Sequence, residues 1–179
     1  MHRDFTFAPL YIDFDKSIAK AILLKKRKTG KMHKLNLEEE KKKFRFKMKL
    51  DIRWSDMDEM RHVNNAVYLT YFEQARVYYF HEACQWNWKE IGAILANAHV
   101  DYLKPVVFPN PTYVYVRVSK IGTKSFETSY MITSIVNGEE QLTTTGYATM
   151  VLFDYKTNAS VAMPDYLKER LKNYEPENI

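Results

Sequence analysis

Three side chains that can take part in acid–base or nucleophilic chemistry lie close together near the middle of the chain. Asp56, Asp58 and His62 stand in the stretch RWSDMDEMRHVNNAVYLTYFEQAR, residues 53–76. The pattern predicts a strand that leads into a loop and then, after an Asn-Asn pair, into a helix. The first main-chain N–H groups of a helix lack intrahelical partners and carry partial positive charge, so they stabilise an anion. A carboxylate that faces such a helix end is equipped to attack a carbonyl group.

The same residues resemble a family signature. The segment S-D-M-D-x-x-x-H-V-N-N-A-x-Y-L-x-Y-F-E-x-A-R, residues 55–76, is similar to that of hotdog-fold acyl thioesterases, namely the 4-hydroxybenzoyl-CoA, short acyl-CoA and plant-type acyl-ACP thioesterases. The likeness continues more loosely to about residue 155. It implies an α+β hotdog fold, in which a curved antiparallel five-stranded sheet wraps around a long central helix. It also implies thioester hydrolysis without a metal or redox cofactor, in a homodimer or homotetramer whose subunits pair edge to edge.

The resemblance assigns the central roles to Asp58 and Asn65. Asp58 matches the acidic residue that serves as nucleophile or general base, and the main-chain N–H of Asn65 matches the donor that polarises the thioester oxygen. The residues themselves leave a structural alternative open at both positions. Asp often stabilises a loop or a helix entry, and either Asn64 or Asn65 can cap the helix.

His62 matches only part of a known pattern. The plant-type enzymes have Asp, Asn and His in a D-x-N-x-H spacing, but here Met60 stands at the Asn position between Asp58 and His62. This departure favours a scheme centred on Asp58, in which His62 orients water or substrate. A structural hydrogen-bonding role for His62 stays open.

Two further acidic residues flank these positions. Asp56 is expected to point away from Asp58, and a structural role is favoured. Glu73 is a candidate secondary acid, since some hotdog thioesterases draw their acid from the central helix. We favour it as a buried partner for a polar group such as Arg76.

Substrate-binding residues follow from the same segment. Tyr68, Tyr71 and Phe72 are candidates to line an apolar tunnel for the acyl tail, with core packing as their alternative role. Arg61 is a candidate contact for coenzyme A phosphates. His81 and Cys84 lie three residues apart, but no further ligand stands at a metal spacing, and Cys84 is interpreted as a small core residue.

Composition divides the chain unevenly. Residues 1–50 contain 15 Lys/Arg and 6 Asp/Glu, whereas residues 51–179 contain 12 and 16. We interpret residues 1–43 as a basic, poorly ordered extension and residues 44–174 as the hotdog domain. No base-reading motif accompanies the basic residues, so nucleic acid is not a predicted partner. No apolar run reaches membrane-spanning length, and a single cysteine fits the cytoplasm.

Periodicity predicts the elements. Residues 44–54 alternate apolar and polar without exception, which indicates a strand with one buried face. A helix follows to about residue 83, with Leu69 and Phe72 on its expected core face and apolar residues on most sides. Four strands, near residues 94–103, 112–120, 125–136 and 141–153, are predicted as an antiparallel meander, with a tight turn at Asn137-Gly138. A short helix is predicted over residues 164–172.

The leading hypothesis is an acyl thioesterase of fatty acid metabolism. It would hydrolyse acyl-CoA, in preference to acyl-ACP, to a free carboxylic acid and a thiol. The alternative is a non-hydrolytic acyl-CoA-binding protein with the same fold. A hotdog hydratase lacks support, because the Gly-Asp turn of those enzymes is missing from the sequence.

Overall fold

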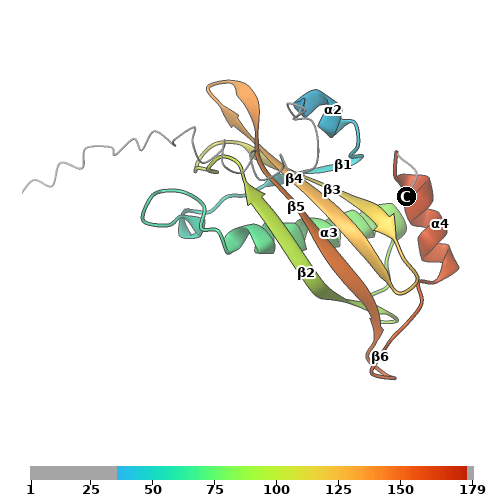
Figure 1. Ribbon diagram of the computed structural model, residues 1–179. Helices are drawn as coiled ribbons and strands as arrows, with labels where there is room; N and C mark the ends of the chain where they lie inside the picture. The colour runs from blue at the N-terminus through green and yellow to red at the C-terminus, as the bar shows by residue number, and fades with distance from the viewer. Residues whose placement is uncertain (1–35, 177–179) are drawn as a thin grey trace, which may run out of the picture. The chain divides into compact units, whose positions relative to one another are not determined.

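The computed structural model describes residues 36–176. Within this range one antiparallel sheet curves around the long helix α3, Val67–Cys84, as predicted (Figure 1). Its strands are β1 (Phe46–Leu50), β2 (Gly92–Tyr102), β3 (Thr112–Ile121), β4 (Ser125–Val136) and β5 (Glu139–Asp154), and the two-residue β6 (Ala159–Ser160) pairs antiparallel with the end of β5. None of the helices in this range is long and apolar enough to cross a membrane.

The order of the strands corrects one prediction. The sheet runs β1-β3-β4-β5-β2, so only β3, β4 and β5 form a meander. β2 pairs with β5 at the far edge, and the segment 103–111, with its three prolines, carries the chain back across to β3. Proline cannot donate to a sheet ladder, so this segment favours a crossing connection over a hairpin.

The hairpin between β4 and β5 was predicted correctly. Asn137 and Gly138 both have positive φ, 52° and 82°, as the tight turns that match strand twist require. The turn sets the register of the two longest strands, which pair from Val136 opposite Glu139 to Ser125 opposite Val151. These strands form the centre of the sheet that faces α3.

The first strand is shorter than its alternation predicted. Pairing with β3 ends at Leu50, and the chain then leaves the sheet and forms the 3-10 helix η2, Trp54–Asp56. Trp54, expected on the buried face, is 74% exposed. The apolar–polar alternation continues beyond the last residue that pairs with β3, so periodicity alone overestimates the length of the strand.

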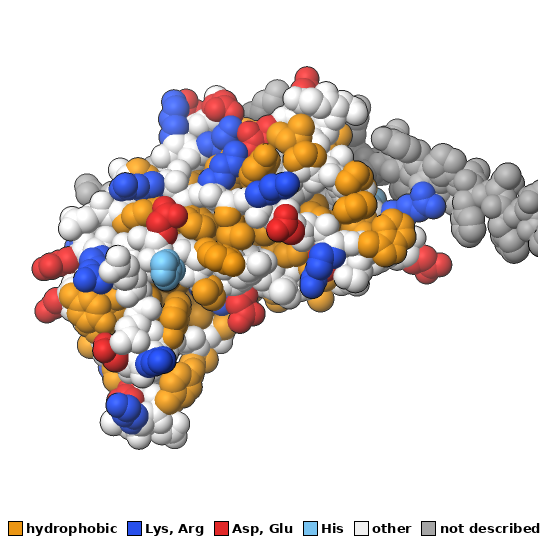
Figure 2. Space-filling view, turned by 180° about the vertical axis from the view of Figure 1, so that it is seen from behind, with side chains coloured by type: hydrophobic (Ala, Val, Ile, Leu, Met, Phe, Trp, Pro, Cys, Tyr) orange, Lys and Arg blue, Asp and Glu red, His pale blue; other side chains and the backbone are white. Residues whose placement is uncertain are grey.

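The helix α3 buries one side against the sheet and leaves the other open. Phe72 and Tyr79 are buried, but Leu69 is 43% exposed and Val77 48% exposed, so the prediction of Leu69 as a core residue is wrong. In Figure 1 the strands pass in front of α3. Figure 2 shows the molecule from behind, and hydrophobic side chains gather along the middle of this rear face. One side of the helix thus lacks a cover within residues 36–176.

Two short helices pack at the periphery. α4, Asp165–Tyr174, packs on α3 through the buried Leu167 and Leu171, close to the predicted range. α2, Leu37–Lys41, is joined to the sheet by an ion pair of 2.7 Å between Lys41 and Glu140. Most of the extension predicted over residues 1–43 lies outside the described residues, and its boundary stays a prediction.

Candidate active site

A tight loop between η2 and α3 carries Asp58. Met57 and Val63 form an isolated antiparallel bridge, and the main-chain N–H of Asp58 donates to the oxygen of His62 at 2.8 Å. The loop closes through Arg61, whose N–H donates to the oxygen of Asp58 and whose φ of 62° lies in the left-handed region. The five residues 58–62 therefore form a closed loop, in which the main chains of Asp58 and His62 lie side by side.

The carboxylate of Asp58 is held on one side only. Its Oδ1 accepts main-chain hydrogen bonds from Met60 at 2.9 Å and from His62 at 3.1 Å. Its Oδ2 accepts no hydrogen bond from the described residues 36–176. The side chain is half-buried, so the loop fixes the carboxylate while one oxygen stays available to a substrate or a water.

Asp56 lies in the 3-10 helix η2, not in a strand, and its surroundings differ from those of Asp58. It is 3% exposed and accepts hydrogen bonds from the main chain and guanidinium of Arg53 and from the hydroxyl of Tyr71. Burial alone would raise the pKa of Asp56, but these donors outweigh it and lower the pKa below its ordinary value. The two aspartates thus have separate environments, one inside the protein and one at its surface.

The start of α3 provides an unpaired donor. The side chain of Asn64 accepts from the main-chain N–H of Ala66 at 3.0 Å, in the turn that leads into α3, and the N-cap residue Ala66 has no side-chain cap. The main-chain N–H of Asn65 has no acceptor among the described residues, while its oxygen accepts a hydrogen bond of 2.9 Å from the hydroxyl of Tyr102. A free amide at the positive end of a helix is suited to a developing oxyanion.

The predicted acyl contacts lie in the core of the chain. Tyr68, Tyr71 and Phe72 are each at most 3% exposed. The hydroxyl of Tyr68 accepts from the N–H of Val106, and Phe72 stacks on Tyr130 with ring centroids 4.2 Å apart. Burial is the largest cause that raises the pKa of Tyr68, to about 12, so this phenol stays protonated near neutral pH. Their contact with an acyl chain stays a prediction.

Glu73 differs from the expectation of a buried partner. It is exposed on α3 and forms no ion pair within residues 36–176. Arg76 instead donates to the hydroxyl of Tyr130 at 2.9 Å. The side chain of Arg61 is exposed, in a position open to solvent and ligands.

Tyr102 is the site residue that sequence reasoning missed. It lies at the end of β2, 37 residues after Asn65, and no spacing rule links the two positions. The only sequence signal is an aromatic residue at a strand end, which is too common to assign a role.

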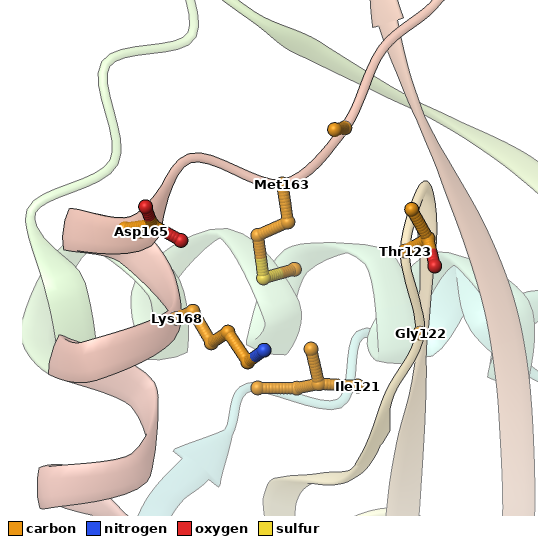
Figure 3. A pocket seen from close by; sticks show the side chains of 7 residues that line it. Ile121, Gly122, Thr123, Met163, Asp165 and Lys168 are labelled. Carbon is orange, nitrogen blue, oxygen red and sulfur yellow. The ribbon is translucent and has the colours of Figure 1, made fainter.

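A separate pocket lies away from these residues. It has a volume of about 410 Å³ and is lined by Ile121, Gly122, Thr123, Ala162, Met163, Asp165 and Lys168. Figure 3 shows the side chain of Lys168 extending from α4 toward Ile121. No hydrogen bond or ion pair joins its polar side chains Thr123, Asp165 and Lys168 to one another within residues 36–176. No group of three metal-ligating side chains occurs in the described part of the chain either.

A curved antiparallel sheet wraps around one helix, and an acidic loop precedes that helix; this is the architecture of the hotdog thioester hydrolases. A family model described as the thioesterase-like superfamily matches residues 52–171, and the chain belongs to this superfamily. It is 27% identical to the long-chain acyl-CoA thioesterase FadM of Escherichia coli K12, over 69% of this chain and 94% of that protein. It is 29% identical to the uncharacterized protein YsmA of Bacillus subtilis strain 168, over 75% and 90% of the two chains.

A solved structure shows the same fold. A thioesterase of Thermus thermophilus, crystallised with coenzyme A and zinc, superposes with a TM-score of 0.66 at 28% identity. The match covers 76% of this chain and 98% of that one. The protein is therefore a hotdog-fold acyl thioesterase, as the resemblance implied.

Proposed function

We propose that the protein hydrolyses acyl-CoA thioesters, with Asp58 as the catalytic carboxylate and the main-chain N–H of Asn65 as the oxyanion donor. The anchoring of Asp58 carries this proposal. One carboxylate oxygen is fixed by the amides of Met60 and His62, and the other accepts nothing from residues 36–176. The main-chain N–H of Asn65, two residues before α3 and without an acceptor among residues 36–176, is the proposed oxyanion donor.

The chemistry follows from these two groups. Oδ2 of Asp58 takes a proton from water while the water oxygen bonds to the thioester carbon. The carbonyl electrons move to the oxygen, which accepts a hydrogen bond from the N–H of Asn65. The carbon–sulfur bond then breaks, its electron pair goes to sulfur, and the thiolate takes the proton from Asp58. In this scheme His62 orients the water or the substrate.

Direct attack by Asp58 is the second route. It forms an acyl–aspartyl anhydride and releases the thiolate, and water then hydrolyses the anhydride. A single turnover in ¹⁸O-water tests this route, because label enters the carboxylate of Asp58 only when water attacks the aspartyl carbonyl of the anhydride. Either route needs Asp58 ionised and Asn65 in place.

The relatives support coenzyme A as the carrier. FadM acts on long-chain acyl-CoA by its name, and the Thermus thermophilus enzyme was crystallised with coenzyme A. We propose acyl-CoA in preference to acyl-ACP, with the exposed Arg61 near the phosphates and the reaction within fatty acid metabolism. Cytoplasmic location rests on the single cysteine, Cys84, which is buried.

The exposed side of α3 supports self-association. Leu69 and Val77 leave a large apolar area open, and β2 is an edge strand with one side unpaired in residues 36–176. Unpaired edges and open apolar faces are usually covered in the native assembly. We propose that a second copy covers them and completes the groove for the acyl chain, in a homodimer or in a homotetramer built from it.

A thiol-release assay on acyl-CoA from C2 to C16 tests the proposal. The Asp58→Asn protein keeps the Oδ1 acceptor and therefore the loop, and its kcat should fall by a factor of about 10²–10⁴. Glu59→Gln is the matched control, because it removes the neighbouring exposed carboxylate. A folded Asp58→Asn protein with normal turnover refutes the assignment. Saturable acyl-CoA binding by the wild type without any thiol release supports the non-hydrolytic alternative.

A further inference from the structure

A buried carboxylate, that of Asp56, lies two residues before Asp58 and takes no part in the chemistry above. Asp56 is the only acidic residue of η2, and its carboxylate is shared between two elements. Oδ1 accepts from Nη2 of Arg53 at 2.9 Å, and Oδ2 accepts from the main-chain N–H of Arg53 at 2.9 Å and from the hydroxyl of Tyr71 at 2.8 Å. Tyr71 belongs to α3, so this carboxylate joins η2 to the helix.

The main chain of Asp56 makes a third connection. Its carbonyl oxygen accepts the N–H of Asn64 at 2.9 Å. Asn64 directly precedes Asn65 and orders the turn before α3, because its side chain accepts the N–H of Ala66 and its carbonyl oxygen accepts the N–H of Val67. One residue therefore holds the chain on both sides of the loop, with Asp58 on one side and Asn65 on the other.

We propose that the hydrogen bond between Asp56 and Tyr71 is a positioning device that sets the placement of Asp58 relative to Asn65. The proposal rests on the proposed function, since these are the two groups whose separation the reaction needs. Neither Asp56 nor Tyr71 touches the substrate in this role. Tyr71 acts through Asp56 instead of lining the acyl tunnel.

The environment of the pair supports positioning over packing. Both side chains are 3% exposed, and a buried carboxylate is costly unless every oxygen is satisfied. An apolar pair of similar volume would hold η2 on α3 as firmly but would not fix a direction. The guanidinium and the main-chain N–H of Arg53, together with the hydroxyl of Tyr71, define the orientation of Asp56, and its own carbonyl transmits that orientation to Asn64.

The variant that tests the device is Tyr71→Phe, which removes only the hydroxyl. A displacement of about 1 Å between reacting groups can lower the rate by about 10²-fold, so kcat should fall by a factor of about 10–100 while KM stays within about twofold. Tyr79→Phe is the matched control. Tyr79 lies on the same helix and is fully buried. Its hydroxyl donates to the carboxylate of Glu175, the residue that directly follows α4. This control should lose thermal stability without losing kcat.

A second readout keeps the device separate from hydrolysis. Amide hydrogen exchange of residues 58–65 should accelerate at least tenfold in Tyr71→Phe and stay at the wild-type rate in Tyr79→Phe. Should Tyr71→Phe fail to fold, Arg53→Gln serves instead, because the Arg53 side chain is 68% exposed and its loss spares the core. The same acceleration and a smaller kcat loss are expected there.

The outcomes distinguish the two proposals. Wild-type exchange and wild-type kcat in folded Tyr71→Phe and Arg53→Gln overturn the positioning role and leave the thioesterase assignment intact. An inactive wild-type protein overturns the thioesterase assignment, and the exchange rates then decide alone whether Asp56 and Tyr71 order the loop. Equal kcat losses in Tyr71→Phe and Tyr79→Phe show a general loss of stability and also overturn the positioning role.

Discussion

The hydroxyl of Tyr102, at the end of the edge strand β2, donates a hydrogen bond of 2.9 Å to the main-chain oxygen of Asn65, at the start of α3. The bond therefore holds the same residue whose main-chain N–H we propose as the oxyanion donor. The ring of Tyr102 also packs edge-on against Tyr68, with centroids 5.0 Å apart. The proposed edge for self-association is therefore connected directly to the proposed catalytic group.

Tyr102→Phe should lower kcat by about tenfold and change thermal stability little, because the ring contact with Tyr68 remains while the hold on Asn65 is lost. Steady-state kinetics on the best acyl-CoA substrate measure this effect. Tyr147→Phe, on the neighbouring strand β5 and 39% exposed, is the control and should retain kcat. Unchanged kcat in Tyr102→Phe would show that Asn65 is held without this bond.

Gly146→Ala should destabilise the protein by about 1–3 kcal/mol through overpacking. A Cβ atom at this position would lie 2.6 Å from the oxygen of His99 and 2.7 Å from the ring of Phe72. Urea unfolding measures the loss. In the double variant with Phe72→Leu the loss should be smaller than the sum of the single losses, because the ring clash is relieved. Strict additivity would place the strain at His99 alone.

Glu140 should make folding sensitive to acid. Burial raises the pKa of Glu140, but hydrogen bonds from Lys41, Thr133 and Tyr115 outweigh it and lower the pKa to about 2. The folded-state pKa lies below the unfolded one, so this stabilisation is complete above about pH 4.5 and is lost as the pH falls toward 2.

The test compares Glu140→Gln with the wild type by thermal unfolding at several pH values. At pH 7 the variant should lose about 1–3 kcal/mol of unfolding free energy, and the difference should shrink below about pH 4. Glu139→Gln, at the adjacent exposed position, should behave like the wild type. A Glu140→Gln deficit that stays constant down to pH 2 contradicts the shifted titration.

Val77→Glu should dissociate the proposed dimer, because a charge on the open face of α3 would be buried against the partner. Sedimentation velocity measures the change in mass. Tyr166→Glu, a comparable change at a 42% exposed position on α4, should leave the assembly intact. A wild-type protein that sediments as a monomer at all concentrations rules out the second copy as the cover of α3.

The local elements could be derived from the sequence because their signals are local. The alternation through Phe46 and Leu50, the Asn137-Gly138 turn and the apolar run from Val67 to Cys84 each identify an element with bounds within a few residues. The loop signature around Asp58 identified the family for the same reason, since its residues are close in sequence. The separate environments of Asp56 and Asp58 did not follow from strand geometry, because residues two apart on a strand share a face and both residues lie beyond the end of β1.

The tertiary structure alone decided which elements meet. It placed β2 beside β5, exposed Trp54 and Leu69, and joined Tyr102 to Asn65. It also turned Arg76 toward Tyr130 and away from Glu73. These relationships depend on the burial and hydrogen bonding of segments far apart in the chain, and many pairings satisfy the same local pattern. Only the packed structure shows which pairing satisfies the burial and the hydrogen bonding of all these segments together.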